Sequence, residues 1–529
     1  MYKVLVTDPI AEQGIEILKK QRDIQVDVKL KIKPEELKSI IGNYDALIVR
    51  SETKVTADII EAGNNLKVIG RAGVGVDNID VISASKKGII VMNTPEGNTI
   101  STAEHTMSMI MALSRNIPQA DLSVKSKKWE RKKYMGVELY GKILGIIGLG
   151  RVGKEVAIRA KSFGMEIIAY DPYLSADMAR KLEIRLVSLD ELISKADYIT
   201  VHTPLTKETK YLIGEKEIAK MKDGVRLINC ARGGIIDERA LLNGLKSGKV
   251  AGAALDVYET EPPPPDFPLF NLENVILTPH LGASTEEAQI SVAVSIANQI
   301  IEVLRGGVVR NAVNAPAIPA DILNQMKPYI DLSEILGKIL VQIIEGFIRN
   351  IKIEYMGQII NYNTSFLTLS VVKGILTPII KEPVNFVNAP LILKERNILV
   401  SESKSSEITH YTNFIKLEII TDKGKKFSIA GTVFGKENTR IVEIGHYDID
   451  LEPAGNMLII YNLDKPGLVG NIGTILGKEK INIASLQMAR KVSGGDAITI
   501  LTVDSMVDEE ILKKLAKVEN IKEVKFVKL

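Results

Sequence analysis

The stretch of residues 142–153 limits the possible folds of this chain more than any other. Apolar residues at 143–147 predict a buried strand, and Gly148, Gly150 and Gly153 follow with G-x-G-x-x-G spacing before a predicted helix. In such a unit the first glycine allows a tight turn, the second lets the backbone approach a pyrophosphate, and the third lets the helix pack closely on the strand. The spacing therefore predicts a parallel α/β sheet that binds a dinucleotide at a helix N-terminus.

The loops after the next strands predict which dinucleotide is bound and where. Asp171 ends the second predicted strand, close to the usual ~20 positions after the first glycine. A carboxylate there accepts hydrogen bonds from ribose hydroxyls and repels a 2′-phosphate, so we expect NAD rather than NADP. Because the carboxyl ends of parallel strands share one edge, later loops converge on the same crevice. From these loops we expect Thr203, Cys230 and Ala231 to contact the cofactor, and Asp256 to bond cofactor or catalytic groups.

Three residues at that edge have the chemistry of hydride transfer to or from a 2-hydroxy acid. Arg232 offers a two-pronged donor for a carboxylate, and His280 can take or return the hydroxyl proton near neutral pH. Glu261 can orient the imidazole and favour its protonated form. Each residue alone has an ordinary alternative as a surface or loop side chain. Together at one sheet edge they predict a catalytic group.

The first part of the chain, residues 1–97, alternates strands and helices without a nucleotide motif after its first strand. A glycine-rich run at 71–78 follows one of its strands and offers backbone amides to an anion. We expect the substrate to be bound here, by Arg50, Ser51, Gly73, Val74, Gly75 and Asn78. A basic run at 129–133 has two readings. It is either a solvated face, or Arg131 or Lys132 meets a substrate phosphate, across a subunit contact.

The remaining organisation follows from periodicity and composition. Long helices at 98–115 and 285–304 join two units, residues 320–453 form another α/β segment, and a β-α-β-β-α-β pattern from residue 456 predicts a ferredoxin-like domain. A net charge of +3 over 529 residues gives no reason to expect nucleic acid as a partner. One cysteine excludes an internal disulfide, and neither a signal peptide nor a membrane span is evident, so we expect a cytoplasmic protein.

Several motifs resemble those of one family. Gly-Leu-Gly-Arg-Val-Gly, Cys-Ala-Arg-Gly-Gly and Pro-His-Leu-Gly-Ala-Ser are similar to motifs of the D-2-hydroxyacid dehydrogenases. Arg-Ala-Gly-Val-Gly-Val-Asp-Asn and Trp-Glu-Arg-Lys-Lys-Tyr-Met-Gly resemble the branch that acts on 3-phosphoglycerate, in its long form. The resemblance implies NAD-dependent oxidation of 3-phospho-D-glycerate to 3-phosphooxypyruvate, the first step of L-serine biosynthesis, by a homotetramer.

The same resemblance implies an architecture and further site residues. It implies a flavodoxin-like substrate domain (1–97 and 286–317), a Rossmann domain (98–285), an intervening domain (318–454) resembling an allosteric substrate-binding domain, and an ACT domain (455–529). It adds Arg151, Val152, Gly282 and Ala283 as cofactor contacts, and gives the catalytic positions to Arg232, Glu261 and His280. Asn462, Asp464 and Asn482 stand where relatives bind L-serine, although Asp464 also suits a plain turn.

Two other functions fit parts of the sequence. A glyoxylate or hydroxypyruvate reductase would share the motifs of the first 317 residues, and so would an NAD(H)-sensing corepressor, which is a binding protein and not an enzyme. The extra C-terminal domains argue against both alternatives.

Overall fold

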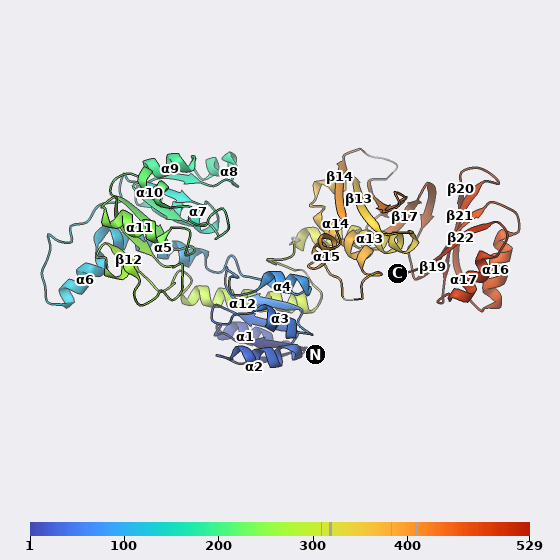
Figure 1. Cartoon of the computed structure of the whole chain (residues 1–529), viewed down its shortest axis with the longest axis horizontal. Coiled ribbons are helices and arrows are strands. Elements are labelled where there is room, and N and C mark those ends of the chain that lie inside the picture. The colour runs from blue at the N-terminus through green and yellow to red at the C-terminus, as the bar shows by residue number, and fades with distance from the viewer. Residues whose placement is uncertain (308, 317–319, 382, 408–410) are drawn as a thin grey trace.

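The computed structural model of the chain describes residues 1–529 except 308, 317–319, 382 and 408–410. The described residues form four β-sheets with their helices. In Figure 1 the second unit lies at the left, the first is next to it, and the third and fourth lie at the right. The second sheet is inserted in the chain of the first, because α12 returns to the first unit after the second is complete.

The first sheet has five parallel strands in the order β2-β1-β3-β4-β5, which is the flavodoxin-like order that we expected. Its strands are β1 (Tyr2–Val6), β2 (Ile24–Val28), β3 (Ala46–Val49), β4 (Val68–Arg71) and β5 (Ile90–Met92). Its helices are α1 (Glu12–Lys19), α2 (Pro34–Ile40), α3 (Ala57–Ala62), α4 (Val81–Lys86) and α12 (Glu286–Leu304), with a 3₁₀ turn, η1 (Ile41–Asn43). Helix α12 packs against α1 so closely that a Cβ on Gly14 would lie 2.6 Å from the Ala293 carbonyl oxygen.

The second sheet has seven parallel strands in the order β12-β11-β10-β9-β6-β7-β8 and confirms the Rossmann prediction. Its strands are β6 (Ile143–Ile147), β7 (Glu166–Tyr170), β8 (Arg185–Leu186), β9 (Tyr198–Val201), β10 (Val225–Asn229), β11 (Val250–Leu255) and β12 (Val275–Leu277). Its helices are α5 (Thr99–Arg115), α6 (Ile117–Lys125), α7 (Arg151–Ser162), α8 (Ala176–Lys181), α9 (Leu189–Lys195), α10 (Glu215–Lys220) and α11 (Glu238–Lys246), with η2 (Pro268–Asn271). The strand order reverses between β6 and β9, and ligands bind at such a switch point.

The third sheet has six strands in the order β14-β13-β15-β16-β17-β18, of which only the β13–β14 pair is parallel. Its strands are β13 (Ile348–Gly357), β14 (Leu399–Ser405), β15 (Asn413–Thr421), β16 (Lys426–Phe434), β17 (Asn438–Ile444) and β18 (Tyr447–Leu451). Its helices are α13 (Ala320–Ile343), α14 (Ser365–Leu376) and α15 (Ala389–Glu395), with η3 (Gln358–Asn361).

The fourth sheet is antiparallel, in the order β20-β21-β19-β22, and has the predicted ferredoxin-like chain order. Its elements are β19 (Asn456–Leu463), α16 (Leu468–Lys478), β20 (Ile483–Arg490), β21 (Asp496–Val503), α17 (Glu509–Ala516) and β22 (Ile521–Lys528).

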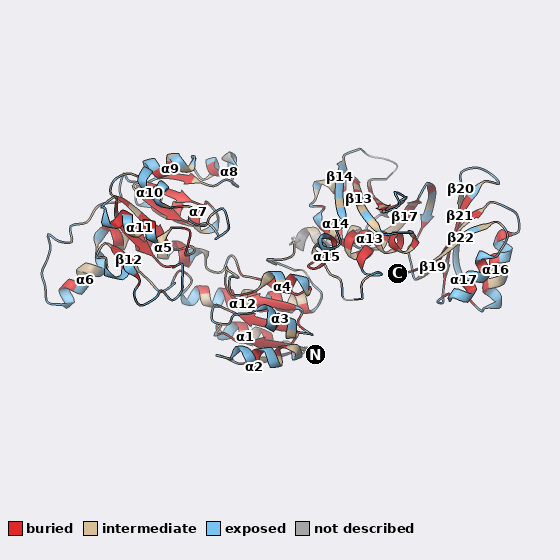
Figure 2. Ribbon diagram, in the orientation of Figure 1, coloured by how far each residue is buried: buried red, intermediate tan, exposed pale blue. Residues whose placement is uncertain are grey.

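The third and fourth sheets share one apolar core. Buried side chains of the fourth sheet, such as Ile459 and Ile500, belong to the same cluster as buried residues of α13 and β15. Figure 2 marks the buried residues of both units in red. Gln342 of α13 bonds the backbone of β22 in both directions, to the carbonyl oxygen and from the amide of Lys528, each at 3.1 Å. These two units therefore pack as one body.

The C-terminal body also meets the first sheet. Asn314 accepts a hydrogen bond from the Val91 amide at 2.9 Å, and the Val313 amide donates to the Val91 carbonyl at 2.7 Å, so this connecting segment lies along strand β5. The Asn385 side chain donates to the Gly88 carbonyl oxygen at 2.7 Å.

Among the residues that the structure describes, no helix has the length and apolar character that a membrane crossing requires.

Candidate active site

The glycine loop after β6 has the geometry of a pyrophosphate site. Gly148 has φ +92°, a conformation that side chains rarely adopt, and a Cβ on Gly153 would lie 2.2 Å from the Gly148 carbonyl oxygen. In contrast, a Cβ on Gly150 would meet no protein atom within 4 Å, so the backbone there borders open space. Gly150 caps α7 without a side-chain bond, which leaves the first helix amides facing that space. The glycines therefore fit a bound dinucleotide phosphate.

Residues at the ends of β7, β9 and β10 line the rest of the nucleotide site. The Asp171 carboxylate accepts hydrogen bonds from the Leu149 and Tyr173 amides, both at 2.9 Å, and thereby fixes the glycine loop beside it. The buried Thr203 hydroxyl has no hydrogen-bond partner among the described residues, as expected of a group that meets a ligand. Burial raises the pKa of the Cys230 thiol to about 12, so this cysteine is not a nucleophile.

A cleft of about 490 Å³ lies between the first and second sheets. Its walls combine the glycine-rich loop after β4 with the loops after β9, β10 and β12 of the second sheet. The predicted site residues that line it are Val74, Gly75, Arg151, Val152, Thr203, Cys230, Ala231, Arg232, His280, Gly282 and Ala283. The expectation that strand ends of one edge converge on one crevice is met for these loops.

His280 and Glu261 form a hydrogen-bonded pair at this cleft. The His280 Nδ1 lies 2.8 Å from Glu261 Oε2, and the other carboxylate oxygen accepts from the Tyr258 amide at 3.1 Å. Burial by itself raises the pKa of Glu261, but the bond with His280 and the nearby Arg232 charge outweigh it and hold the pKa below its usual value. The carboxylate therefore stays ionised beside the imidazole, and Nε2 is the ring nitrogen free for proton transfer.

Arg232 reaches from the second sheet across to the loop of the first. A Cβ on Gly75 would lie only 2.1 Å from Arg232 Nη2, so the guanidinium lies directly against the backbone of that loop. Arg232 Nε is 3.3 Å from Asp77 Oδ2, and Nη1 donates to the Ala231 carbonyl at 2.7 Å. The site therefore presents a fixed cation at the place where the two units meet.

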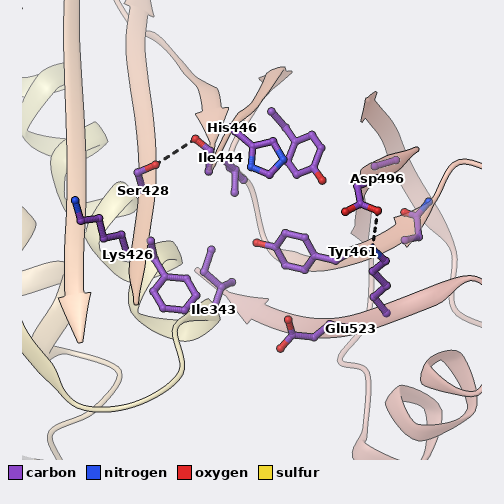
Figure 3. A pocket seen from close by; sticks show the side chains of 14 residues that line it. Ile343, Lys426, Ser428, Ile444, His446, Tyr461, Asp496 and Glu523 are labelled. Carbon is purple, nitrogen blue, oxygen red and sulfur yellow. Dashed lines mark hydrogen bonds and ion pairs between the residues drawn. The ribbon is translucent and has the colours of Figure 1, made fainter. Parts of the chain in front are cut away.

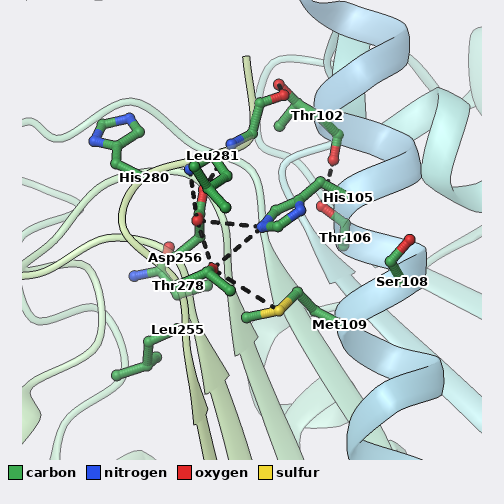
Figure 4. A network of polar contacts seen from close by, with 12 residues as sticks. Thr102, His105, Thr106, Ser108, Met109, Leu255, Asp256, Thr278, His280 and Leu281 are labelled. Atoms are coloured by element: carbon green, nitrogen blue, oxygen red, sulfur yellow. Dashed lines mark hydrogen bonds and ion pairs between the residues drawn. The ribbon is translucent and has the colours of Figure 1, made fainter. Parts of the chain in front are cut away.

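Asp256 lies under the loop that holds His280 (Figure 4). Its carboxylate accepts hydrogen bonds from the amides of Leu281 and Gly282, both at 2.8 Å, and its backbone carbonyl accepts from the His280 amide at 2.9 Å. His280 has φ +56°, an unfavourable value for a residue other than glycine. These bonds hold the catalytic loop in its strained conformation.

Comparison with known proteins agrees with this geometry. Three protein-family models match the sequence. The family model of the D-isomer specific 2-hydroxyacid dehydrogenase NAD-binding domain matches residues 107–282. Those of the D-3-phosphoglycerate dehydrogenase intervening domain and of the ACT domain match residues 325–445 and 456–520. The D-3-phosphoglycerate dehydrogenase of Methanocaldococcus jannaschii is 48% identical over 530 residues, covering 100% of both chains. That of Bacillus subtilis is 46% identical over 529 residues, also covering 100% of both.

The chain belongs to the D-3-phosphoglycerate dehydrogenase family. Among solved structures, the D-lactate dehydrogenase of Aquifex aeolicus, complexed with NAD and lactic acid, is 30% identical with a TM-score of 0.54. It covers 60% of this chain and 100% of its own, as expected if the likeness is confined to the dehydrogenase part. The chain is thus an NAD-dependent oxidoreductase with an ACT domain.

In this family member, sequence reasoning missed Arg71 as a site residue. Arg71 ends β4, its Nε is buried without a hydrogen-bond partner in the described structure, and a Cβ on Gly73 would lie 2.1 Å from its Nη1. Burial lowers the pKa of Arg71 to about 10, with further lowering by the positive charge of Arg232. Arg71 could have been predicted as a site residue because it ends a strand at the sheet edge where ligands bind.

Other predicted substrate residues lie outside the cleft lining. The Asn78 amide donates to the Arg50 and Thr53 carbonyl oxygens, at 2.8 and 2.6 Å, so it braces the loop after β3. Arg50 borders a separate open cavity of about 580 Å³, next to the start of α12.

 The walls of this cavity also include Gln13 and Thr285. Ser51 is exposed.

The basic run after α6 is likewise remote from the cleft within one chain. Arg131 and Lys132 are exposed and do not line the cleft, and the neighbouring Lys133 pairs with Glu273 at 3.1 Å. Within one chain these two side chains therefore do not contribute to the cleft.

A second cavity, of about 320 Å³, lies between the third and fourth sheets (Figure 3). Tyr461 and the charged side chains of Lys426, Asp496 and Glu523 border it. Burial raises the pKa of Tyr461 to about 12. Of the three predicted effector residues, only Asn462 lines this cavity.

The predicted effector residues do not converge within one chain. The buried Asn462 accepts a hydrogen bond from the Thr499 hydroxyl at 2.9 Å, and Asn482 donates to Asp504 at 2.7 Å. Asp464 pairs with Arg490 and accepts from the Gly494 amide, and these bonds hold its pKa below the usual value. Their polar groups are therefore largely engaged within the chain itself.

Proposed function

We propose that this chain oxidises 3-phospho-D-glycerate to 3-phosphooxypyruvate with NAD, the first step of L-serine biosynthesis. The observation that carries the proposal is that Arg232 and His280 line one cleft, with Glu261 bonded to His280 and Arg232 against the loop of the first sheet. Full-length relatives that bear the name D-3-phosphoglycerate dehydrogenase support the choice of substrate.

The chain's own residues account for substrate binding and proton transfer. Arg232 binds the substrate carboxylate with its remaining donors and places the hydroxyl group near His280. His280 Nε2 takes the hydroxyl proton during oxidation and returns it during reduction. Glu261, bonded to Nδ1 at 2.8 Å, stabilises the imidazolium that forms. NAD held by the glycine loop and the residues around Thr203 would supply the acceptor for the hydride of the substrate carbon.

The phosphate is the group that separates this substrate from simpler 2-hydroxy acids. Arg71 supports a phosphate site because it is a buried cation with an unpartnered nitrogen beside the glycine-rich loop. The positive charge of Arg50 is close enough to lower the pKa of Arg71, and it adds to the positive potential beside the glycine-rich loop. Arg131 or Lys132 of a second copy would complete the site.

The proposal extends to assembly, regulation and location. We place the domains at 1–97 with 286–317, 98–285, 318–454 and 455–529, consistent with the four sheets. We expect a homotetramer in the cytoplasm, with L-serine as an effector at the ACT domain. Because Asn462, Asp464 and Asn482 do not converge in one chain, the effector site would form between two copies.

The test is an NAD-linked assay with 3-phospho-D-glycerate, D-glycerate and D-lactate, repeated with NADP and with L-serine. We expect NADH formation to be fastest by a large factor with the phosphorylated substrate and NAD. Rapid glyoxylate reduction without oxidation of 3-phosphoglycerate would refute the assignment and favour a reductase. NADH binding without turnover of any of these compounds would favour a dinucleotide-sensing protein.

A further inference from the structure

The buried carboxylate of Asp256 has a partner that the reaction scheme above does not use. His105 lies on α5, and its Nε2 is 3.2 Å from Asp256 Oδ1 and 3.3 Å from the Thr278 hydroxyl (Figure 4). The Thr278 hydroxyl itself donates to the same carboxylate oxygen at 2.6 Å. Asp256 is fully buried, so each of these donors replaces water that the carboxylate has lost.

The identity of the partners fixes the role of the His105 nitrogen. An ionised carboxylate only accepts hydrogen bonds, and the single proton of the Thr278 hydroxyl is already directed at Asp256. Nε2 of His105 must therefore carry the proton for this contact to be favourable. Burial raises the pKa of Asp256, but the bonds from His105, Thr278 and Leu281 outweigh it and keep the carboxylate ionised.

Two further titratable side chains lie close enough to Asp256 for its charge to affect their pKa, and neither carries a compensating positive charge. Burial raises the pKa of both the Cys230 thiol and the Tyr258 phenol to about 12, so both stay neutral at the pH of an assay. The Tyr258 hydroxyl donates to the Thr278 carbonyl oxygen at 2.9 Å and not to the carboxylate. His105 is therefore the side chain whose ring N–H can compensate the buried charge.

The same face of α5 holds the loop at a second point. The Thr102 hydroxyl donates to the Gly282 carbonyl oxygen at 3.1 Å, one helical turn before His105. Asp256 meanwhile accepts from the amides of Leu281 and Gly282. Helix α5 thus contacts the loop directly through Thr102 and indirectly through His105 and Asp256.

We infer that His105 is a positioning residue: through its N–H bond to Asp256 it holds the 280–282 loop, and with it His280, in the conformation that hydride transfer requires. His105 is not among the residues that line the cleft, and its ring bonds Asp256 and Thr278, so it acts through Asp256. The consequence is a second histidine–carboxylate pair behind the first. The pair at the cleft moves the proton, and the pair beneath it sets the geometry.

This inference rests on the proposed function for its rate measurements, and three variants test it. His105→Leu removes the N–H at similar volume, His105→Gln keeps an N–H donor of similar reach, and Ser108→Ala is the matched control. Ser108 is exposed on α5, and its hydroxyl bonds only its own helix, to the Glu104 carbonyl at 2.8 Å. For each purified full-length variant, kcat, KM, NADH affinity by nicotinamide fluorescence and the unfolding temperature are measured.

We expect kcat of His105→Leu to fall about ten- to a hundredfold, the range for losing one hydrogen bond to a buried charge. Its KM for 3-phosphoglycerate should change little, because Arg232 and Arg71 are untouched, and NADH should bind more weakly because the loop carries Gly282 and Ala283. His105→Gln should recover most of the rate, and Ser108→Ala should match the wild type.

Equal rates for His105→Leu and Ser108→Ala would overturn the inference, and so would a glutamine variant no better than leucine. If His105→Leu fails to fold, His105→Asn replaces it, since the shorter amide should not reach Asp256 and should lose rate relative to glutamine. Should the wild type itself not oxidise 3-phosphoglycerate, the proposed function fails. The inference is then judged by NADH affinity, which His105→Leu must lower and Ser108→Ala must not.

Discussion

Replacing Glu261 by glutamine tests the catalytic pair directly. The change keeps the size of the side chain and an oxygen for the Tyr258 amide, but it removes the negative charge 2.8 Å from His280 Nδ1. A hydrogen bond to a charged group contributes about 1.5–3 kcal/mol. The Glu261 side chain is 38% exposed, and solvent screening favours the lower part of this range, about 2 kcal/mol.

That energy applies to the state in which the imidazole is charged, and about 2 kcal/mol corresponds to about a thirtyfold loss of kcat. Because the Glu261 carboxylate is ionised and favours the protonated imidazole, its loss should also change the pH profile of kcat, and an unchanged profile would count against the pair. KM should change little because Glu261 does not line the cleft. The assay is steady-state NADH formation from 3-phosphoglycerate at several neutral pH values.

Glu259→Gln provides the control. Glu259 lies two positions earlier, and its carboxylate accepts from the Tyr211 hydroxyl at 3.0 Å and from the Glu238 amide at 3.2 Å, away from His280. It should retain nearly the wild-type rate. If Glu261→Gln were within twofold of wild type, or if both variants lost rate equally, the assignment of a stabilising carboxylate to Glu261 would be wrong.

Four other substitutions have definite expected outcomes. Gly153→Ala should lower both the unfolding temperature and NADH affinity, because its Cβ would lie 2.2 Å from a backbone oxygen. Gly150→Ala should lower NADH affinity alone, because its Cβ would meet no protein atom within 4 Å. Fluorescence titration of NADH and thermal unfolding distinguish the two variants. Arg71→Met should raise KM for 3-phosphoglycerate about tenfold or more but leave weak D-glycerate oxidation unchanged, as steady-state kinetics will reveal. Burial raises the pKa of Glu334, yet Lys373 at 2.8 Å and Lys338 at 2.9 Å lower it by more. The ionised carboxylate therefore stabilises the fold above the usual pKa of glutamate, and this stabilisation is lost as the pH falls. The unfolding temperature of Glu334→Gln should lie below that of the wild type at neutral pH, and the difference should disappear in acid.

The sequence predicted the fold class and the strand-end loops because both depend on local spacing. The glycine turn after β6 and the alternation of strands and helices are visible along the chain, and both sheets have the expected order. Strand β8 was not predicted, because two residues are too few to show periodicity. The third sheet was predicted only as an α/β segment.

Site residues that depend on three-dimensional contacts were harder to predict. No role for His105 could be predicted from the sequence, because nothing near it along the chain indicates Asp256, which follows a strand far away in the sequence. Arg71 stood in a recognised motif, but its burial without a partner is a tertiary property. Asn78 was in the same motif, and only the structure reveals that its amide bonds the loop after β3.

The apolar core common to the third and fourth sheets has a practical consequence for protein engineering. Cutting the chain before β19 to remove the ACT domain would uncover the side of the third unit against which Ile459 and Ile500 pack, and would leave Gln342 without its backbone partner. Such a truncated protein should be prone to aggregation, irrespective of any effect on regulation. A cut before α13 would instead remove the third and fourth units together, so their common core would stay intact. That boundary is the one to use when making a dehydrogenase without its C-terminal half.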